Sequence, residues 1–196
     1  MSHSAETEIK LEVRDLRAMR GQIRRLGFEK IQSRHFESNT LYDFADLRLW
    51  RARCLLRLRY ADKQWLLTFK GAPRTSRNYK IRREVETTVE DGEELQAILE
   101  AVGLRAAFRY EKYRTIYADK PRAGGRRRPQ LVLDETPIGT YLELEGPQRW
   151  IDRVAGKLGY RREDYITASY AALYRQKCQE QGVPPTNMVF TRAKSC

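Results

Sequence analysis

The sequence predicts an α+β protein: an eight-stranded antiparallel β-barrel, or tunnel, with amphipathic helices packed on its outside. Three observations predict it. Eight segments alternate apolar and polar residues with a period of two, and three others space their apolar residues as helices do. The polar faces of the strands also carry charges that are sorted by sign. Antiparallel strands with one charged face, and an apolar face covered by helices, are typical of a barrel whose charged faces point inward.

The predicted strands have Gly or Pro only at their ends. They cover residues 6–13, 30–43, 54–61, 63–70, 79–90, 106–118, 129–136 and 139–146. In the first strand, Glu6, Glu8, Lys10 and Glu12 share one face, because successive side chains alternate sides. The opposite face is apolar and is expected to pack against helices.

Three helices follow acidic strands, and each is expected to end at a glycine, namely Gly27, Gly103 or Gly159. Their apolar stripes are Leu16, Met19, Ile23 and Leu26; Leu95, Ile98, Leu99 and Val102; and Trp150, Ile151, Val154 and Leu158. The segment 164–176 is predicted to be a closing helix, with Tyr165, Tyr170 and Tyr174 packed against the barrel mouth. We expect one domain over residues 1–176 and a peripheral tail over 177–196.

The composition favours an anionic partner. Lys and Arg outnumber Asp and Glu by 38 to 26, which gives a net charge of +12. No apolar run approaches the roughly 20 residues that span a membrane, and the N-terminus lacks the pattern of a secretory signal. The three cysteines (Cys54, Cys178 and Cys196) have no metal-type spacing. Reduced thiols and a cytoplasmic protein are therefore expected.

The charged faces divide the predicted interior into an acidic wall and a basic wall. Carboxylates come from Glu6 and Glu8 in one strand and from Asp134, Glu143 and Glu145 in two others. Cations come from other strands: Arg57, Arg59, Lys70, Lys112 and Arg114. Carboxylate oxygens coordinate Mg²⁺ or Mn²⁺, and Arg and Lys hold polyphosphate. Like charges inside a protein are costly unless a ligand neutralises them, which favours a ligand site.

Six motifs, in this order, resemble the CYTH superfamily, also called triphosphate tunnel metalloenzymes. They are ETEIK, LRLR, TFKG, an R-x-E-x-E at Arg82, EKYR, and LDETPIGTYLELEG. The resemblance covers about residues 5–175, and DYITASYAALY looks like the closing helix of the family. It implies an eight-stranded antiparallel tunnel that binds a triphosphate and a divalent metal, Mg²⁺ or Mn²⁺. Relatives suggest a homodimer.

The resemblance also implies roles for individual residues. Metal ligands would be Glu6, Glu8, Asp134, Glu143 and Glu145. The triphosphate would be held by Lys10, Arg57, Arg59, Lys70, Arg82, Lys112 and Arg114, and catalysis would rest on Glu6, Glu8 and Lys10. Glu84 and Glu86 are additional candidates, because their role varies across the family.

The layout looks most like bacterial class IV adenylate cyclases, which convert ATP to cyclic AMP and pyrophosphate. A complete acidic pair, Glu143 and Glu145, is also typical of the hydrolases of the family, so a triphosphatase acting on tripolyphosphate or an organic triphosphate is the alternative. The stretch before Arg57 lacks the tryptophan expected of a thiamine triphosphatase. All of these reactions need cations to neutralise charge that develops on phosphate oxygens.

Two non-catalytic readings stay open. A tunnel that binds polyphosphate without turning it over would use the same residues. A basic RNA-binding protein would exploit the first helix and the loop at Arg126, Arg127 and Arg128. The cations lack interleaved aromatic residues suited to base stacking, so a nucleic-acid partner is not expected.

Overall fold

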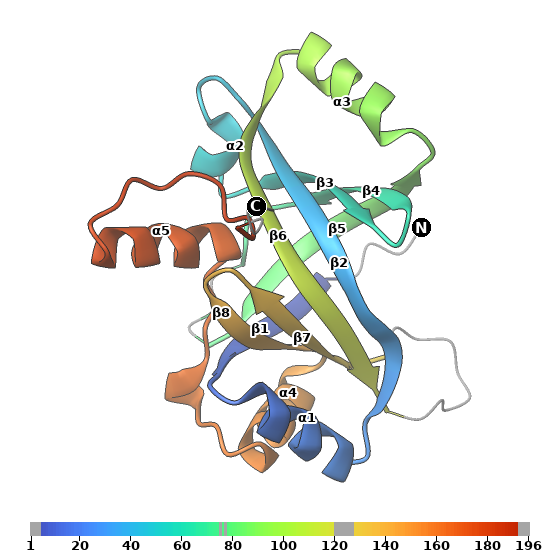
Figure 1. The fold of residues 1–196 in the computed structure, drawn as a ribbon, viewed down its shortest axis with the longest axis vertical. Coiled ribbons are helices and arrows are strands. Elements are labelled where there is room, and N and C mark those ends of the chain that lie inside the picture. The colour runs from blue at the N-terminus through green and yellow to red at the C-terminus, as the bar shows by residue number, and fades with distance from the viewer. Residues whose placement is uncertain (1–4, 75, 77, 120–127, 192–196) are drawn as a thin grey trace, which may run out of the picture.

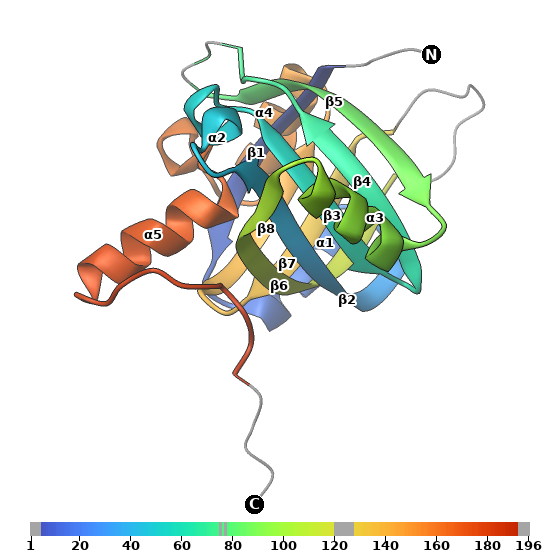
Figure 2. The same ribbon diagram turned by 90° about the horizontal axis from the view of Figure 1, so that it is seen from above.

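In the computed structural model, which describes residues 5–74, 76, 78–119 and 128–191, eight strands close into one barrel (Figures 1 and 2). All neighbouring strands pair antiparallel, in the order β1-β5-β4-β3-β2-β6-β7-β8. The strands are β1 (Ala5–Val13), β2 (Glu29–Phe44), β3 (Leu55–Ala61), β4 (Gln64–Lys70), β5 (Lys80–Val89), β6 (Leu104–Ala118), β7 (Gln130–Thr136) and β8 (Gly139–Glu145). The predicted fold class is confirmed. Each predicted strand matches an observed one to within two residues at both ends.

The helices lie outside the barrel, as predicted. They are α1 (Leu16–Arg25), α2 (Arg48–Arg51), α3 (Gly92–Ala101), α4 (Gln148–Lys157) and α5 (Tyr170–Glu180). The Asp91 carboxylate caps α3 by accepting hydrogen bonds from the backbone N–H groups of Glu93 and Glu94. Gly27, Gly103 and Gly159 follow the ends of α1, α3 and α4 with φ of +87°, +94° and +87°. The predicted helix ends are thus confirmed, since glycine adopts this conformation without a steric penalty.

The main hydrophobic core lies outside the barrel, between its wall and two helices. Ile9 and Leu11 of β1 point outward with Leu142 and Leu144 of β8. Against them pack Met19 and Ile23 of α1 and Trp150, Ile151 and Val154 of α4. Full burial of one such side chain contributes about 1.5–3 kcal/mol to folding. This outer core fixes which face of β1 turns inward, and it leaves Glu6, Glu8 and Lys10 inside.

The closing helix begins later than the sequence pattern predicts. Residues 162–164 form a 3-10 turn, and Ile166 then exchanges two backbone hydrogen bonds of 2.9 Å with Lys10. Ser169 caps α5, which continues to Glu180, so the predicted start at residue 164 is wrong. The bridge to β1 uses the backbone N–H and C=O groups of Ile166, which are therefore not available for hydrogen bonds within a helix.

Part of the C-terminal tail is not peripheral. Met188 is 1% exposed and packs in a cluster with Tyr110, Tyr141 and Tyr170. Its backbone N–H donates to Arg109 O at 3.0 Å, and its carbonyl accepts from Glu111 N at 2.9 Å. The sequence did not predict this contact, because a single backbone bridge produces no periodic pattern of apolar residues. Arg126, Arg127 and Cys196 lie outside the described residues.

Candidate functional site

The inward faces of the strands line a charged tunnel. The register places Glu6 of β1 opposite Arg82 of β5, and Lys10 opposite Glu143 of β8. Glu8 lies between Lys80 of β5 and Glu145 of β8. A cavity of about 180 Å³ inside the tunnel is lined largely by charged side chains. From the predicted set, its lining includes Glu6, Glu8, Lys10, Arg57, Arg59, Lys70, Arg82, Glu84, Glu86, Lys112, Arg114, Glu143 and Glu145.

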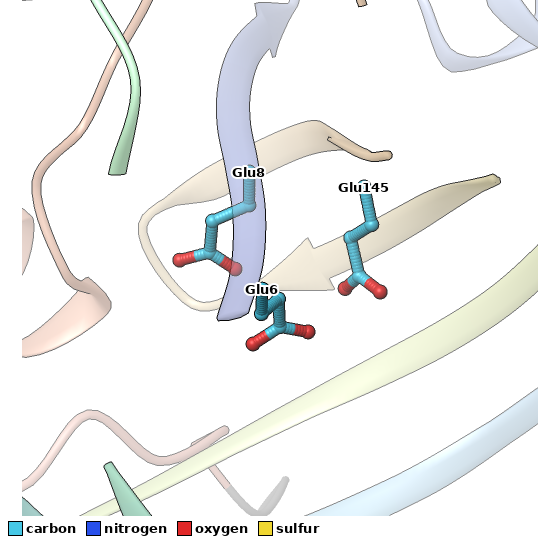
Figure 3. A group of neighbouring side chains, drawn as sticks. All are labelled: Glu6, Glu8 and Glu145. Carbon is cyan, nitrogen blue, oxygen red and sulfur yellow. The ribbon is translucent and has the colours of Figure 1, made fainter. Parts of the chain in front are cut away.

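Three of the predicted metal ligands converge. Figure 3 shows Glu6 and Glu8 from β1 and Glu145 from β8 as neighbouring side chains, and one oxygen from each lies within 4.8 Å of the others. Burial and the nearby Glu6 and Glu143 carboxylates raise the pKa of Glu145 to about 8. The carboxylates of the group therefore repel one another when all three are ionised.

The donor set of this group fits a hard divalent cation. It offers carboxylate oxygens only, which Mg²⁺ and Mn²⁺ prefer over the nitrogen and sulfur ligands of zinc sites. A cation placed among Glu6, Glu8 and Glu145 would also relieve the repulsion that raises the pKa of Glu145. The residues present thus fit the metal that the sequence predicts.

Glu8 differs from Glu145 because ammonium groups surround it. Its Oε1 accepts from Lys80 Nζ at 2.7 Å and lies 3.7 Å from Lys10 Nζ. Burial disfavours the charged form, but Lys10, Lys80 and Lys70 hold the pKa of Glu8 well below its usual range. Glu8 is therefore held in its carboxylate form by the positive charge of these ammonium groups.

Lys70 joins the carboxylate group to β5. Its Nζ lies 3.0 Å from Glu6 and 3.0 Å from Glu84. Burial and a hydrogen bond with Glu6 raise the pKa of Glu84 to about 7. Glu84 therefore lies beside the predicted metal ligands and changes charge near neutral pH.

The basic wall is held by carboxylates of its own. Arg57 Nη2 donates to Thr68 Oγ1 at 3.1 Å and to Glu86 Oε2 at 3.4 Å. Arg59 reaches the same Glu86 oxygen at 3.3 Å. Glu86 also accepts a 2.6 Å hydrogen bond from Thr68. Glu86 is thus a positioning group for two cations of the predicted triphosphate cradle.

Asp134 and Glu143 have different surroundings from the other predicted ligands. Asp134 is fully buried, accepts two 2.7 Å hydrogen bonds from Arg114, and accepts from Lys112 at 2.9 Å. Glu143 pairs with Arg114 at 2.7 Å and with Lys10 at 3.0 Å. Neither carboxylate joins the group of three shown in Figure 3. In this structure, both orient cations of the cradle.

Three further residues in the tunnel are absent from the predicted site. Lys80 contacts Glu8, and its position two residues before Arg82 puts it on the same strand face, a signal the sequence does offer. Glu37 of β2 is 2% exposed and lies 3.4 Å from both Arg59 and Lys112. Only strand pairing reveals Glu37, since its own strand shows no run of charge.

The third is Tyr170, at the start of α5. The sequence predicts that it packs the barrel mouth; it lines the tunnel as well, and its hydroxyl donates to Asp134 at 2.8 Å. Its ring faces Lys10 and Lys112 at 5.2 and 5.3 Å. Lys177 of α5 is not part of the tunnel lining, and its Nζ donates to the carbonyl of Ile138.

The arrangement can hold a polyanion between two unlike walls. Cations on β3, β4, β5 and β6 present N–H donors suited to phosphate oxygens, and the carboxylates of β1 and β8 lie across the same cavity. Within the described ranges, no helix is both long and apolar enough to cross a membrane.

Comparisons with known proteins agree with this geometry. A relative from Methanocaldococcus jannaschii, named "Putative adenylate cyclase", is 28% identical over 140 residues, covering 71% of this chain and 75% of that protein. A solved structure from Vibrio parahaemolyticus, also titled as a "putative adenylate cyclase", superposes with a TM-score of 0.73 at 19% identity, covering 86% and 97% of the two chains.

A solved structure from Hippeastrum is titled a "Putative adenylyl cyclase" that "reveals a dominant triphophatase activity". It superposes with a TM-score of 0.61 at 20% identity, covering 92% of this chain and 97% of that one. At these identities, the structures show a shared fold. The CYTH domain matches residues 4–170, most of the sequence, and the chain therefore belongs to the CYTH domain family.

Proposed function

We propose that this protein is a divalent-metal-dependent enzyme that acts on a triphosphate bound in the tunnel, with class IV adenylate cyclase chemistry as its reaction. The observation that carries the proposal is the group Glu6, Glu8 and Glu145, which lines one cavity together with Arg57, Lys70 and Lys112. Carboxylates at a phosphate site repel the ligand unless a cation lies between them. The names of the relatives support the cyclase assignment.

Each wall has a distinct part in the proposed reaction. When bound by Glu6, Glu8 and Glu145, Mg²⁺ or Mn²⁺ would neutralise phosphate charge and help to orient the reacting oxygen. Lys10, Arg57, Arg59, Lys70, Arg82, Lys112 and Arg114 would bind the phosphate chain, and charge that develops on the leaving pyrophosphate would be stabilised by these fixed donors. Glu37, Glu86, Asp134 and Glu143 would keep the cations in place between turnovers.

A triphosphatase is the second candidate. Glu143 and Glu145 are both present, and the Hippeastrum structure is titled for that activity. The same cradle serves both reactions. They differ in the nucleophile, which is the ribose 3′-hydroxyl in a cyclase and water in a hydrolase.

The proposed setting follows from the same features. The described cysteines Cys54 and Cys178 are free thiols, which supports a reducing compartment such as the cytoplasm. The proposed partner is a small triphosphate, ATP or tripolyphosphate, and the carboxylates in the tunnel argue against nucleic acid as its ligand.

A product assay separates the two reactions. Purified protein is incubated with Mn²⁺ or Mg²⁺ and either ATP or tripolyphosphate, and the products are resolved chromatographically. Cyclic AMP and pyrophosphate in equal amounts are expected from ATP. Orthophosphate release from tripolyphosphate without a cyclic product would establish the hydrolase instead. No turnover of either compound would contradict both reactions on these two substrates.

A further inference from the structure

A second cleft lies on the outside of the barrel, between α1 and the outer faces of β2 and β6. In Figure 1 this region is at the lower ends of β2 and β6, beside α1. Its volume is about 570 Å³. Thr115 and Tyr117 of β6 line it, whereas Arg114 and Ile116 line the tunnel, so the wall of the barrel separates the two cavities.

The cleft is rich in cations. Among the described residues, Arg20, Arg24, Lys30 and Arg34 line it together with one carboxylate, that of Glu29. Two of the cations are fixed at its edge, because Arg20 Nη2 and Arg34 Nε both donate to Glu135 Oε1 at 3.0 Å.

The other two cations are available to a ligand. Arg24 and Lys30 are exposed, and neither forms an ion pair with a carboxylate in the described part of the chain. Arg34, for comparison, is also stacked 3.5 Å from the centre of the Tyr113 ring. Arg20 and Arg34 are already held in place, so they lose less side-chain conformational entropy when an anion binds. This arrangement, together with the unpaired Arg24 and Lys30, favours anion binding.

A buried hydroxyl provides an independent observation. Thr115 is 3% exposed, and its Oγ1 has no hydrogen-bond partner within the described ranges. Buried polar groups are almost always hydrogen-bonded, because losing water without replacement is costly. A small movement of the side chains that cover this hydroxyl would let it donate the missing hydrogen bond to an anion in the cleft.

We propose that this outer cleft binds a small phosphate-bearing anion. Guanidinium, ammonium and hydroxyl donors together match the acceptor oxygens of a phosphate group. Phe28 and Tyr117 form an apolar floor that limits water and strengthens these contacts. The proposal does not depend on the reaction in the tunnel, and it would survive the failure of that assignment.

Residue-resolved NMR titration tests the proposal. The ¹⁵N-labelled full chain is titrated with pyrophosphate at constant ionic strength in a metal-chelated buffer. Amide signals of Lys30 and Thr115 report the cleft, and those of Arg57 and Lys70 report the tunnel. We expect the cleft signals to follow a binding curve of their own, which Arg24→Ala and Thr115→Val each weaken by about tenfold.

Arg25→Ala is the matched control, because Arg25 is the exposed neighbour of Arg24 in the last turn of α1 and lies outside the cleft. It should leave the cleft curve unchanged. The thermal midpoint of Thr115→Val should be equal to or above that of the wild type, since the hydroxyl it removes has no partner.

Three results would overturn the proposal. The first is the absence of a saturable change in the cleft signals. The second is equal weakening by Arg24→Ala and Arg25→Ala, which would indicate a diffuse positive field. The third is binding of single-stranded RNA that depends on Arg24 while pyrophosphate does not bind, which would make the surface a nucleic-acid site.

Discussion

Two groups of carboxylates inside the tunnel use the same residue types in opposite ways. Asp134 is fully buried and receives hydrogen bonds from Arg114, Lys112 and Tyr170, so its charge is satisfied by protein groups. Glu6, Glu8 and Glu145 crowd one another, and the pKa of Glu145 rises to about 8. The first arrangement anchors cationic side chains, and the second is the proposed metal site.

The neighbours of the two groups differ in whether they can change charge. Arg114 beside Asp134 keeps its proton at any ordinary pH. Beside Glu8, burial lowers the pKa of Lys80 to about 8, with Lys10 and Lys70 adding repulsion and Glu8 opposing them. Lys80 and Glu84 beside the proposed ligand site can therefore change charge near neutral pH, whereas Arg114 beside Asp134 keeps its charge. Four substitutions or conditions test this difference.

The largest effect is expected from Glu8→Gln. Loss of one anionic ligand should lower turnover on the order of 10²–10³-fold, because charge on the phosphates is then less well neutralised. The fold should persist, since Lys80 can release a proton when its partner is neutral. Turnover and circular dichroism are measured together. Glu12→Gln, on the same strand but outside the tunnel lining, is the control; near wild-type turnover in Glu8→Gln would remove Glu8 from the metal site.

Asp134→Asn should act on stability first. It leaves Arg114 and Lys112 buried beside a neutral amide, and breaking a buried pair costs about 3–5 kcal/mol. For a chain of this size, we expect the thermal midpoint to fall by roughly 10 °C. An unchanged midpoint with lost metal binding would instead make Asp134 a ligand, as the resemblance implies.

Arg57→Ala should weaken triphosphate affinity by about 10–100-fold, through loss of charge-assisted hydrogen bonds in a buried site. Calorimetric titration with a non-hydrolysable ATP analogue measures it. The exposed Arg83 of β5, substituted by Ala, is a charge-matched control outside the tunnel lining. Equal affinity of Arg57→Ala and wild type would take Arg57 out of the cradle.

The smallest effect concerns pH. Because the pKa of Glu145 is raised to about 8, its carboxyl is mostly protonated at pH 7 before metal binds, and the metal must displace that proton. Affinity for Mg²⁺ should fall by up to about tenfold per pH unit below 8 and level off above it. Calorimetry in buffers of different ionisation enthalpy should detect close to one released proton. In Glu145→Gln this proton release should disappear; its persistence would assign the proton to another group, such as Glu84.

The stability of the metal-free protein depends on pH in the opposite direction. A carboxyl with a raised pKa binds its proton more tightly in the folded state, so its contribution favours folding at low pH. That contribution is lost as pH rises from the ordinary value near 4.5 toward 8. Asp134 has the opposite tendency, because Arg114 and Lys112, against the effect of burial, lower its pKa.

Alternation along each strand predicted most of the site. Glu8, Arg57 and Lys112 were identifiable because a period of two separates the charged face from the apolar face in any strand. Glu37 was not, because its importance comes from Arg59 and Lys112 on the neighbouring strands β3 and β6. Tyr170 was predicted only to pack at the barrel mouth, because a helical pattern does not indicate that the first residue of the helix lines the tunnel.

The sequence by itself determined the strands, the helix ends at glycine, and the sign of charge on each strand face, because these depend on local periodicity and backbone preference. Only the tertiary structure decided which carboxylates meet. Strand register placed Glu145 beside Glu8, and Arg114 beside Asp134, so that carboxylates of the same chemistry form the proposed ligand group in one place and an anchor for cations in the other. Electrostatic environment depends on neighbours from distant strands, and those neighbours exist only once the barrel has closed.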